Sequence, residues 1–153
     1  MIDRLQRIKA LRVKRAEQYL SLQQMKLQTA HQRHQQALQN VQDYYQWRIK
    51  EEQRLFKLCQ GKLIDRKGLE HWQQQVAQLR ENEAQLEKKI AEILEQVELE
   101  FRQLQECQRV LHHARRQQEK FNELSRQKQE ALRIQSEYQE ELEQEEFHRQ
   151  ERV

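Results

Sequence analysis

The stretch Gly61-Lys62-Leu63-Ile64-Asp65-Arg66-Lys67-Gly68 contains both glycines of a chain that has no proline. Glycine ends helices because it adopts left-handed backbone angles at little cost. This stretch is therefore the place where a long helix can stop and the chain can reverse. We predict two helices, at residues 1–60 and 69–150, joined by a turn at 61–68.

The composition argues against a compact globule. Of the 153 residues, 35% are charged and 7% are aromatic, which leaves too little apolar side chain for a layered core. Strong helix formers dominate, whereas disordered chains are normally rich in Pro, Gly and Ser. No stretch approaches ~18 consecutive apolar residues, and no apolar segment follows the basic N-terminus. We expect no membrane insertion, no cleaved signal peptide and a cytoplasmic location.

Heptad periodicity is strongest after the glycines. Counted from Leu69, the first and fourth positions of seven heptads are apolar at twelve of fourteen places, with Glu83 and Glu100 as the exceptions. A seam sustained for this length predicts a coiled coil. The positions are Leu69, Val76, Glu83, Ile90, Val97, Leu104 and Leu111, alternating with Trp72, Leu79, Leu86, Ile93, Glu100, Cys107 and Ala114.

The first helix shows a broader stripe. Its seven-residue series is Leu20, Leu27, His34, Val41, Arg48 and Leu55, flanked by Ala16, Ala30, Ala37, Leu38, Tyr44, Tyr45, Leu58 and Cys59. About eight residues can reverse a chain but cannot carry it back along a long helix, so the two helices pair antiparallel. The predicted fold is all-α: a long two-helix antiparallel coiled-coil hairpin forming a single elongated domain.

The two arms are unequal in length. The second helix is longer by roughly twenty residues, so residues 130–153 extend past Met1 as an overhang. An isolated helix is marginally stable in water, and the seam has decayed in this segment. We expect the overhang to fray alone or to become ordered against another protein.

The ends carry opposite charges. Residues 1–50 hold ten Lys or Arg against three Asp or Glu, and residues 137–153 hold seven Glu against Arg149 and Arg152. Both blocks oppose the helix dipole, so helix propensity does not explain them. Two interpretations remain open: the basic start lies beside the acidic end and they compensate each other, or they form a charged tip that docks on a partner.

The sequence gives little support for nucleic-acid binding, metal binding or enzymatic activity. The basic N-terminus does not run into a clean heptad seam, and the net charge is only +3, so we expect no nucleic-acid binding. The pairs His31/His34 and His112/His113 lack clustered Cys or carboxylate ligands, so we expect no metal. Without a nucleophile–base pair, a phosphate-binding loop or a pocket, we expect neither an enzyme nor a cofactor.

Apolar residues outside the seam are more informative. Ile8, Leu11, Leu22 and Met25 lie opposite the stripe near the start of the first helix. Near the turn the corresponding residues are Trp47, Ile49 and Phe56, with Leu63 and Ile64 in the loop. Clusters of this kind indicate contact surfaces, or else a locally wider core or a third short helix packed on the end.

This organisation resembles the YscO family of type III secretion proteins, and more distantly the flagellar export protein FliJ. The segment Leu69-Glu-His-Trp72-Gln-Gln-Gln-Val76-Ala-Gln-Leu79, leading into Leu86-Glu-Lys-Lys-Ile90, carries the resemblance together with the basic first helix and the Gly-containing turn. The resemblance implies a central stalk that engages the hexameric export ATPase, the cytoplasmic domain of the export gate and secretion chaperones, at the cytoplasmic face of the apparatus.

Carried onto this chain, the resemblance implies a contact surface at each end. The open end, residues 1–25 with 125–153, would enter the ATPase ring through Arg4, Arg7, Ile8, Leu11, Arg12, Arg15, Leu22, Met25, Tyr138 and Leu142. The turn end would face the gate or chaperones through Trp47, Ile49, Phe56, Leu63, Ile64 and Trp72. The alternatives are a static coiled-coil scaffold or tether, and a dedicated secretion chaperone.

Overall fold

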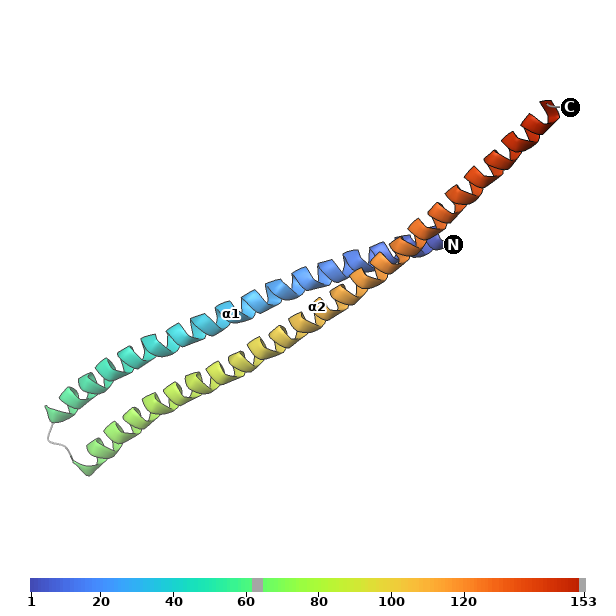
Figure 1. Ribbon diagram of the computed structural model, residues 1–153. Coiled ribbons are helices and arrows are strands. Elements are labelled where there is room, and N and C mark those ends of the chain that lie inside the picture. The colour runs from blue at the N-terminus through green and yellow to red at the C-terminus, as the bar shows by residue number, and fades with distance from the viewer. Residues whose placement is uncertain (62–64, 152–153) are drawn as a thin grey trace. The chain divides into compact units, whose positions relative to one another are not determined.

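The computed structural model describes residues 1–61 and 65–151, and its regular structure there is helical throughout. Helix α1 spans Ile2–Gln60 and helix α2 spans Arg66–Glu151 (Figure 1). No strand occurs in these two ranges. The two helices pack against each other in opposite directions, which confirms the predicted all-α coiled-coil hairpin.

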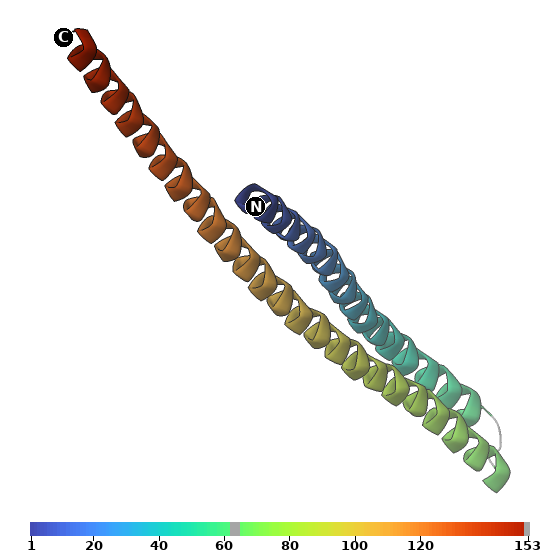
Figure 2. The ribbon, with the colours of Figure 1, turned by 90° about the vertical axis from the view of Figure 1, so that its right-hand side faces the viewer.

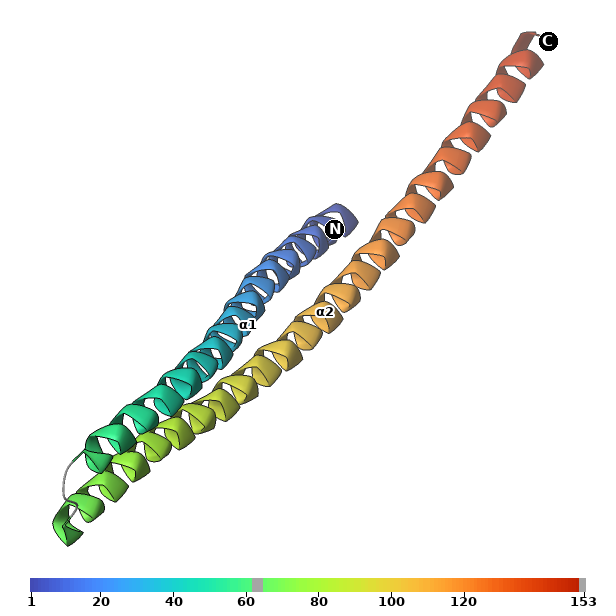
Figure 3. The ribbon, with the colours of Figure 1, turned by 90° about the vertical axis from the view of Figure 1, so that its left-hand side faces the viewer.

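The chain divides into two compact units, each built from one segment of α1 and one of α2. The terminal unit comprises Met1–Ser21 and Glu106–Val153, and the turn unit comprises Leu22–Gln105. Within each unit the two segments run side by side and antiparallel in all three views (Figures 1, 2 and 3). Each unit is thus a helix pair with a seam of its own.

The seam of α2 follows the predicted heptads. Every predicted position from Trp72 to Ala114 is buried or half-buried, and the spacing continues through Gln118, Phe121 and Ser125. Leu69 is the exception, because it lies in the first turn of α2 and is 42% exposed. The heptad pattern therefore predicts burial along almost all of the paired part of α2.

The seam of α1 is narrower than predicted. Buried and half-buried positions recur every three or four residues from Ile2 to Cys59, as in a regular coiled coil. Leu38, Tyr45 and Leu58 were expected in the stripe, but they are exposed. A single partner helix covers only about two positions per heptad, so it leaves these flanking residues in solvent.

Small side chains dominate the core. In the terminal unit Val13, Ala16 and Leu111 form a buried cluster, with Leu20 and Ala114 packed against it. In the turn unit Ala30 and Val97 are buried. No large side chain is completely buried in the described residues, because a helix pair has no third layer to close over it.

Helix α2 begins at Arg66 rather than at Leu69, and Asp65 is the cause. The Gly68 N–H donates to Asp65 Oδ1 at 2.8 Å, and the Leu69 N–H donates to the Asp65 carbonyl at 3.1 Å. Asp65 is thus an N-cap, which satisfies a backbone donor of the first turn. Neither glycine has a left-handed φ, so Gly68 is part of the helix rather than of the turn.

The last part of α2 has no intramolecular cover. The side-chain amide of Gln6 donates to Asn122 Oδ1 at 3.1 Å, and Ser125 is the last buried residue. Every residue from 126 to 151 is exposed, and this end of α2 extends past the N-terminus of α1 (Figure 1, red). The overhang was predicted to begin at residue 130; in the described chain it comprises residues 126–151. Neither α1 nor α2, over the residues described, contains an apolar stretch of the length that a membrane-spanning helix needs.

Candidate partner-binding surfaces

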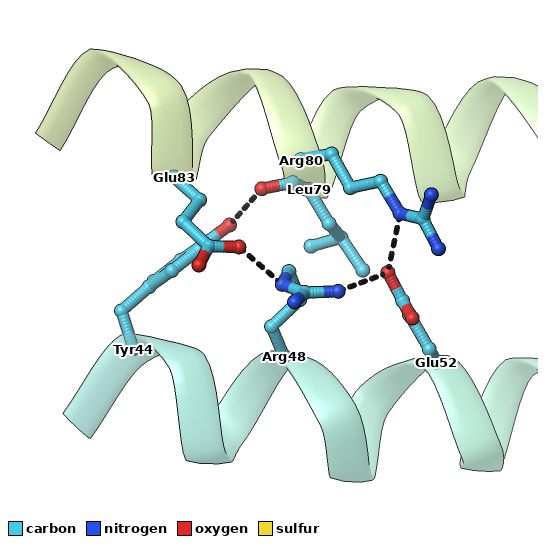
Figure 4. Close-up of polar contacts among 6 residues, drawn as sticks. All are labelled: Tyr44, Arg48, Glu52, Leu79, Arg80 and Glu83. Carbon is cyan, nitrogen blue, oxygen red and sulfur yellow. Dashed lines mark hydrogen bonds and ion pairs between the residues drawn. The ribbon is translucent and has the colours of Figure 1, made fainter. Parts of the chain in front are cut away.

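A polar cluster interrupts the seam of the turn unit, and it joins the two helices (Figure 4). Arg48 of α1 forms an ion pair through Nε with Glu83 of α2, and its Nη1 donates to Glu52 at 2.8 Å. Arg80 of α2 reaches the same Glu52 oxygen at 3.3 Å. Each positive charge in the cluster thus meets a carboxylate, as charged groups in a half-buried seam require.

Hydrogen bonds and charges within the cluster favour the ionised forms of Arg48 and Glu52. Hydrogen bonding to Glu52 raises the pKa of Arg48, and the charges of Glu52 and Glu83 reinforce the effect. Burial by itself raises the pKa of Glu52, but the hydrogen bonds and charges of Arg48 and Arg80 outweigh it and lower the net pKa. Both shifts favour the charged forms, the guanidinium of Arg48 and the carboxylate of Glu52.

Two polar seam positions of α1 lie opposite polar seam positions of α2. Arg48 and Glu83 interrupt the apolar series of their own helices, and they pair. The same holds for Gln23, which is buried and donates to Glu100 Oε2 at 2.5 Å and to the Glu100 carbonyl at 3.0 Å. Near the first cluster, Tyr44 Oη donates to the Leu79 carbonyl at 2.8 Å (Figure 4). Polar pairs at facing seam positions favour a single register of the two helices, because a shift would leave these groups without partners.

Gln23 is a residue that the sequence reasoning missed. A polar side chain between Ala16 and Ala30 breaks the apolar series, so the pattern there looked broad rather than regular. The signal was present as a seven-residue spacing through Ala16, Gln23, Ala30, Ala37 and Tyr44. That spacing, together with the polar Glu100 in the seam of α2, is the sequence signal of the pair.

The aromatic residues predicted at the turn end divide between core and surface. Trp72 is half-buried in the seam and packs against Phe56, with ring centroids 6.1 Å apart. Trp47 is 49% exposed and packs against Tyr44, with ring centroids 5.5 Å apart. Ile49 is half-buried, and Leu63 and Ile64 lie outside the described residues. Trp47 and Phe56 are therefore the predicted contacts here with the most open surface.

The predicted open-end residues lie in both units. Arg4, Arg7, Ile8, Leu11, Arg12 and Arg15 are exposed on α1 in the terminal unit. Tyr138 and Leu142 are exposed on the overhang in the same unit. Leu22 and Met25, although exposed, belong to the turn unit, where they line a shallow groove of about 390 Å³ with Ala30 and Ile93.

The structure does not support mutual compensation of the basic start and the acidic end. Helix α2 passes the N-terminus of α1 near Asn122, so the glutamates from 137 onward lie beyond it. In the described residues the ion pairs that join α1 to α2 in the terminal unit are limited to Glu17–Arg115, at 3.4 Å. The charged blocks are therefore left available to partners.

In the described residues, no three His, Cys, Asp or Glu side chains lie close enough together to bind a metal ion. The candidate histidines lie on the paired helices and belong to no such group; they are His31, His34, His112 and His113. What the surface offers is charge, exposed aromatic rings and shallow grooves, which suit protein–protein contact.

Comparison with known proteins identifies the family. Residues 2–150 match the family model described as type III secretion protein YscO. The chain is 50% identical over 126 residues to the Yop proteins translocation protein O of Yersinia pseudotuberculosis serotype I, covering 82% of each chain. It also matches the crystal structure of the type III secretion protein YscO from Vibrio parahaemolyticus with a TM-score of 0.88 and 37% identity, over 96% of this chain and 92% of that one. The chain therefore belongs to the YscO family of type III secretion proteins.

Proposed function

We propose that this protein is a central-stalk component of a type III secretion export apparatus. In this role it couples the hexameric export ATPase to the cytoplasmic domain of the export gate and engages secretion chaperones. Family membership supports a place in the type III secretion apparatus. The exposed overhang supports the stalk role, because a helix without intramolecular cover is suited to bind a partner protein.

To couple the ATPase to the gate, the paired helices must keep their register while they transmit force. A seam of apolar residues alone can slip, because one Leu or Ala position resembles the next. Arg48–Glu83 and Gln23–Glu100 oppose slippage in the turn unit, since any shift leaves half-buried polar groups without partners. Polar pairs at seam positions are the usual means of fixing register in coiled coils.

The two ends take different partners in this proposal. The open end presents Arg4, Arg7 and Arg12 with exposed Ile8 and Leu11, which suits an acidic or mixed surface inside the ATPase ring. The turn end presents Trp47 and Phe56, and exposed aromatic rings are the most frequent anchors of protein interfaces. Gate or chaperone binding is assigned to this end.

The test is the effect of the purified chain on the export ATPase. We expect association with the ATPase and a change in its rate of ATP hydrolysis. The double variant Arg4→Glu/Arg7→Glu should lose this effect, because charge reversal removes the electrostatic complementarity. A matched control is Lys88→Glu/Lys89→Glu, which reverses two exposed charges in the turn unit.

Loss in the control as well, or no association at all, would contradict the stalk assignment. A tight complex with one secreted cargo and no effect on hydrolysis would instead point to a dedicated chaperone. At the turn end, Trp47→Ser should weaken binding to the gate domain or to chaperones while leaving the hydrolysis effect intact.

A further inference from the structure

Charge is segregated within the terminal unit. Its paired part, residues 1–21 with 106–126, holds eleven Lys or Arg and five Asp or Glu, a net charge of +6. Residues 127–151 of the overhang hold three Lys or Arg and eight Glu, a net charge of −5. A basic helix pair is thus followed directly by an acidic single helix.

These charges are not neutralised inside the unit. Arg12 and Arg15 are exposed and form no ion pair with any described residue, and the same is true of Glu141 and Glu145. The overhang cannot turn back to meet the basic part, because α2 is one continuous helix through both. The complementary charges can meet only between molecules.

The basic part also contains a groove between α1 and α2. It has a volume of about 440 Å³, and Ala16, Tyr19, Val110 and Ala114 provide its apolar surface. Arg12 and Arg15 belong to its lining on the α1 side, with Lys9 held over the Phe121 ring at 5.1 Å. The groove is shaped and charged for an acidic amphipathic helix.

The overhang is such a helix. Tyr138 and Leu142 are four residues apart, so they share one face, and both are exposed. Glu141 and Glu145 flank that face along one edge, also four residues apart. Apolar side chains for the groove and carboxylates for its basic rim therefore occur together on one surface.

We infer that this groove binds the overhang of a second copy of the chain, and that two copies dock reciprocally. In the dimer each overhang lies in the groove of the other molecule, with Tyr138 and Leu142 in the apolar part and Glu141 and Glu145 toward Arg12 and Arg15. Each terminal unit then becomes a three-helix layer, which removes the overhang's exposed apolar face from water. The same surface is the one assigned above to the ATPase, so dimerisation and ATPase engagement exclude each other.

The experiment is sedimentation equilibrium of the full-length chain with two charge-swapped variants. Arg12→Glu/Arg15→Glu makes the groove rim acidic, and Glu141→Arg/Glu145→Arg makes the overhang basic. We expect the unmodified chain to dimerise, and each variant alone to dimerise at least ~10-fold more weakly because like charges oppose. An equimolar mixture should recover the dimer, since both dockings of the mixed pair are complementary.

A matched control is Glu95→Arg/Glu98→Arg, which reverses two exposed charges in the turn unit and should dimerise like the unmodified chain. Circular dichroism measures helix content and so verifies that each variant folds. Glu141→Arg/Glu145→Arg changes no contact between α1 and α2 of the same molecule. A chain that stays monomeric to about 100 µM, or a mixture no tighter than its components, would overturn the inference. Failure of this inference and failure of the stalk assignment are distinguishable, because the ATPase assay uses different variants and a different readout.

Discussion

At the scale of single residues, Arg48 shows why a charge is tolerated in a coiled-coil seam. Its side chain is 13% exposed and contacts two carboxylates, Glu83 across the seam and Glu52 on its own helix. An apolar pair would stabilise the helices at least as well, because burying ions costs solvation. The pair is therefore better explained by register than by stability.

Replacing one partner should cost more than replacing both. Arg48→Met leaves the Glu83 carboxylate half-buried without its partner, and we expect a loss of roughly 2–3 kcal/mol in the free energy of unfolding. Arg48→Met/Glu83→Leu should recover to within about 1 kcal/mol of the unmodified chain, or exceed it. Urea denaturation measures the unmodified chain and both variants, and a double variant that loses as much as Arg48→Met, or more, would contradict this account.

Low pH should remove the contribution of Glu52 to the stability of the folded chain. Its pKa in the folded chain lies below the ordinary value of 4.5, so its stabilising contribution is present above pH 4.5 and is lost as the pH falls through the lowered value. We expect Glu52→Gln to melt lower than the unmodified chain at pH 7, and the difference in Tm to shrink toward pH 3. Comparing the two proteins cancels the titration of the other carboxylates. A difference that stays constant with pH would contradict the assignment.

At the scale of the elements, heptad spacing predicts the seam of α2 but not its start. Trp72 through Ala114 lie where the pattern places them, because burial against one helix follows the period of the side chains. The glycines alone do not predict this start, because Asp65 caps the first turn of α2. Gly68 then fits inside the first turn, where its N–H bonds to Asp65.

Substituting Asp65 tests that boundary. Asp65→Ala removes the acceptor for the Gly68 N–H, and we expect a loss of about 1 kcal/mol in the free energy of unfolding. Asp65→Asn and Asp65→Ser keep an oxygen at the same place and should lose much less. Thermal and urea denaturation measure the difference, and equal losses in all three variants would show that the cap contributes nothing.

The overhang and the paired helices should differ in dynamics. An uncovered helix opens more readily than one held by a seam, so backbone amides in residues 128–150 should exchange with solvent faster than those in residues 90–114. Hydrogen exchange with mass spectrometry at low protein concentration, where the chain is monomeric, measures both ranges. Similar protection in the two ranges would mean that the overhang is stable without a partner.

At the scale of the whole molecule, the sequence predicts the fold and family but not how the candidate surfaces are arranged. Leu22 and Met25 look equivalent to Ile8 and Leu11 in the sequence, yet the structure assigns the two pairs to different units. The sequence also could not decide whether the charged ends compensate each other. That depends on where Asn122 meets Gln6, which is a matter of register rather than of composition.

The central claim is that one chain connects the export ATPase to the export gate. The most direct measurement is size-exclusion chromatography with light scattering on a mixture of the chain, the ATPase and the gate's cytoplasmic domain. The account predicts a single complex containing all three proteins, because the two partners occupy different ends. Arg4→Glu/Arg7→Glu should remove only the ATPase, and Trp47→Ser should weaken only the gate. Displacement of the ATPase by the gate domain would contradict the claim.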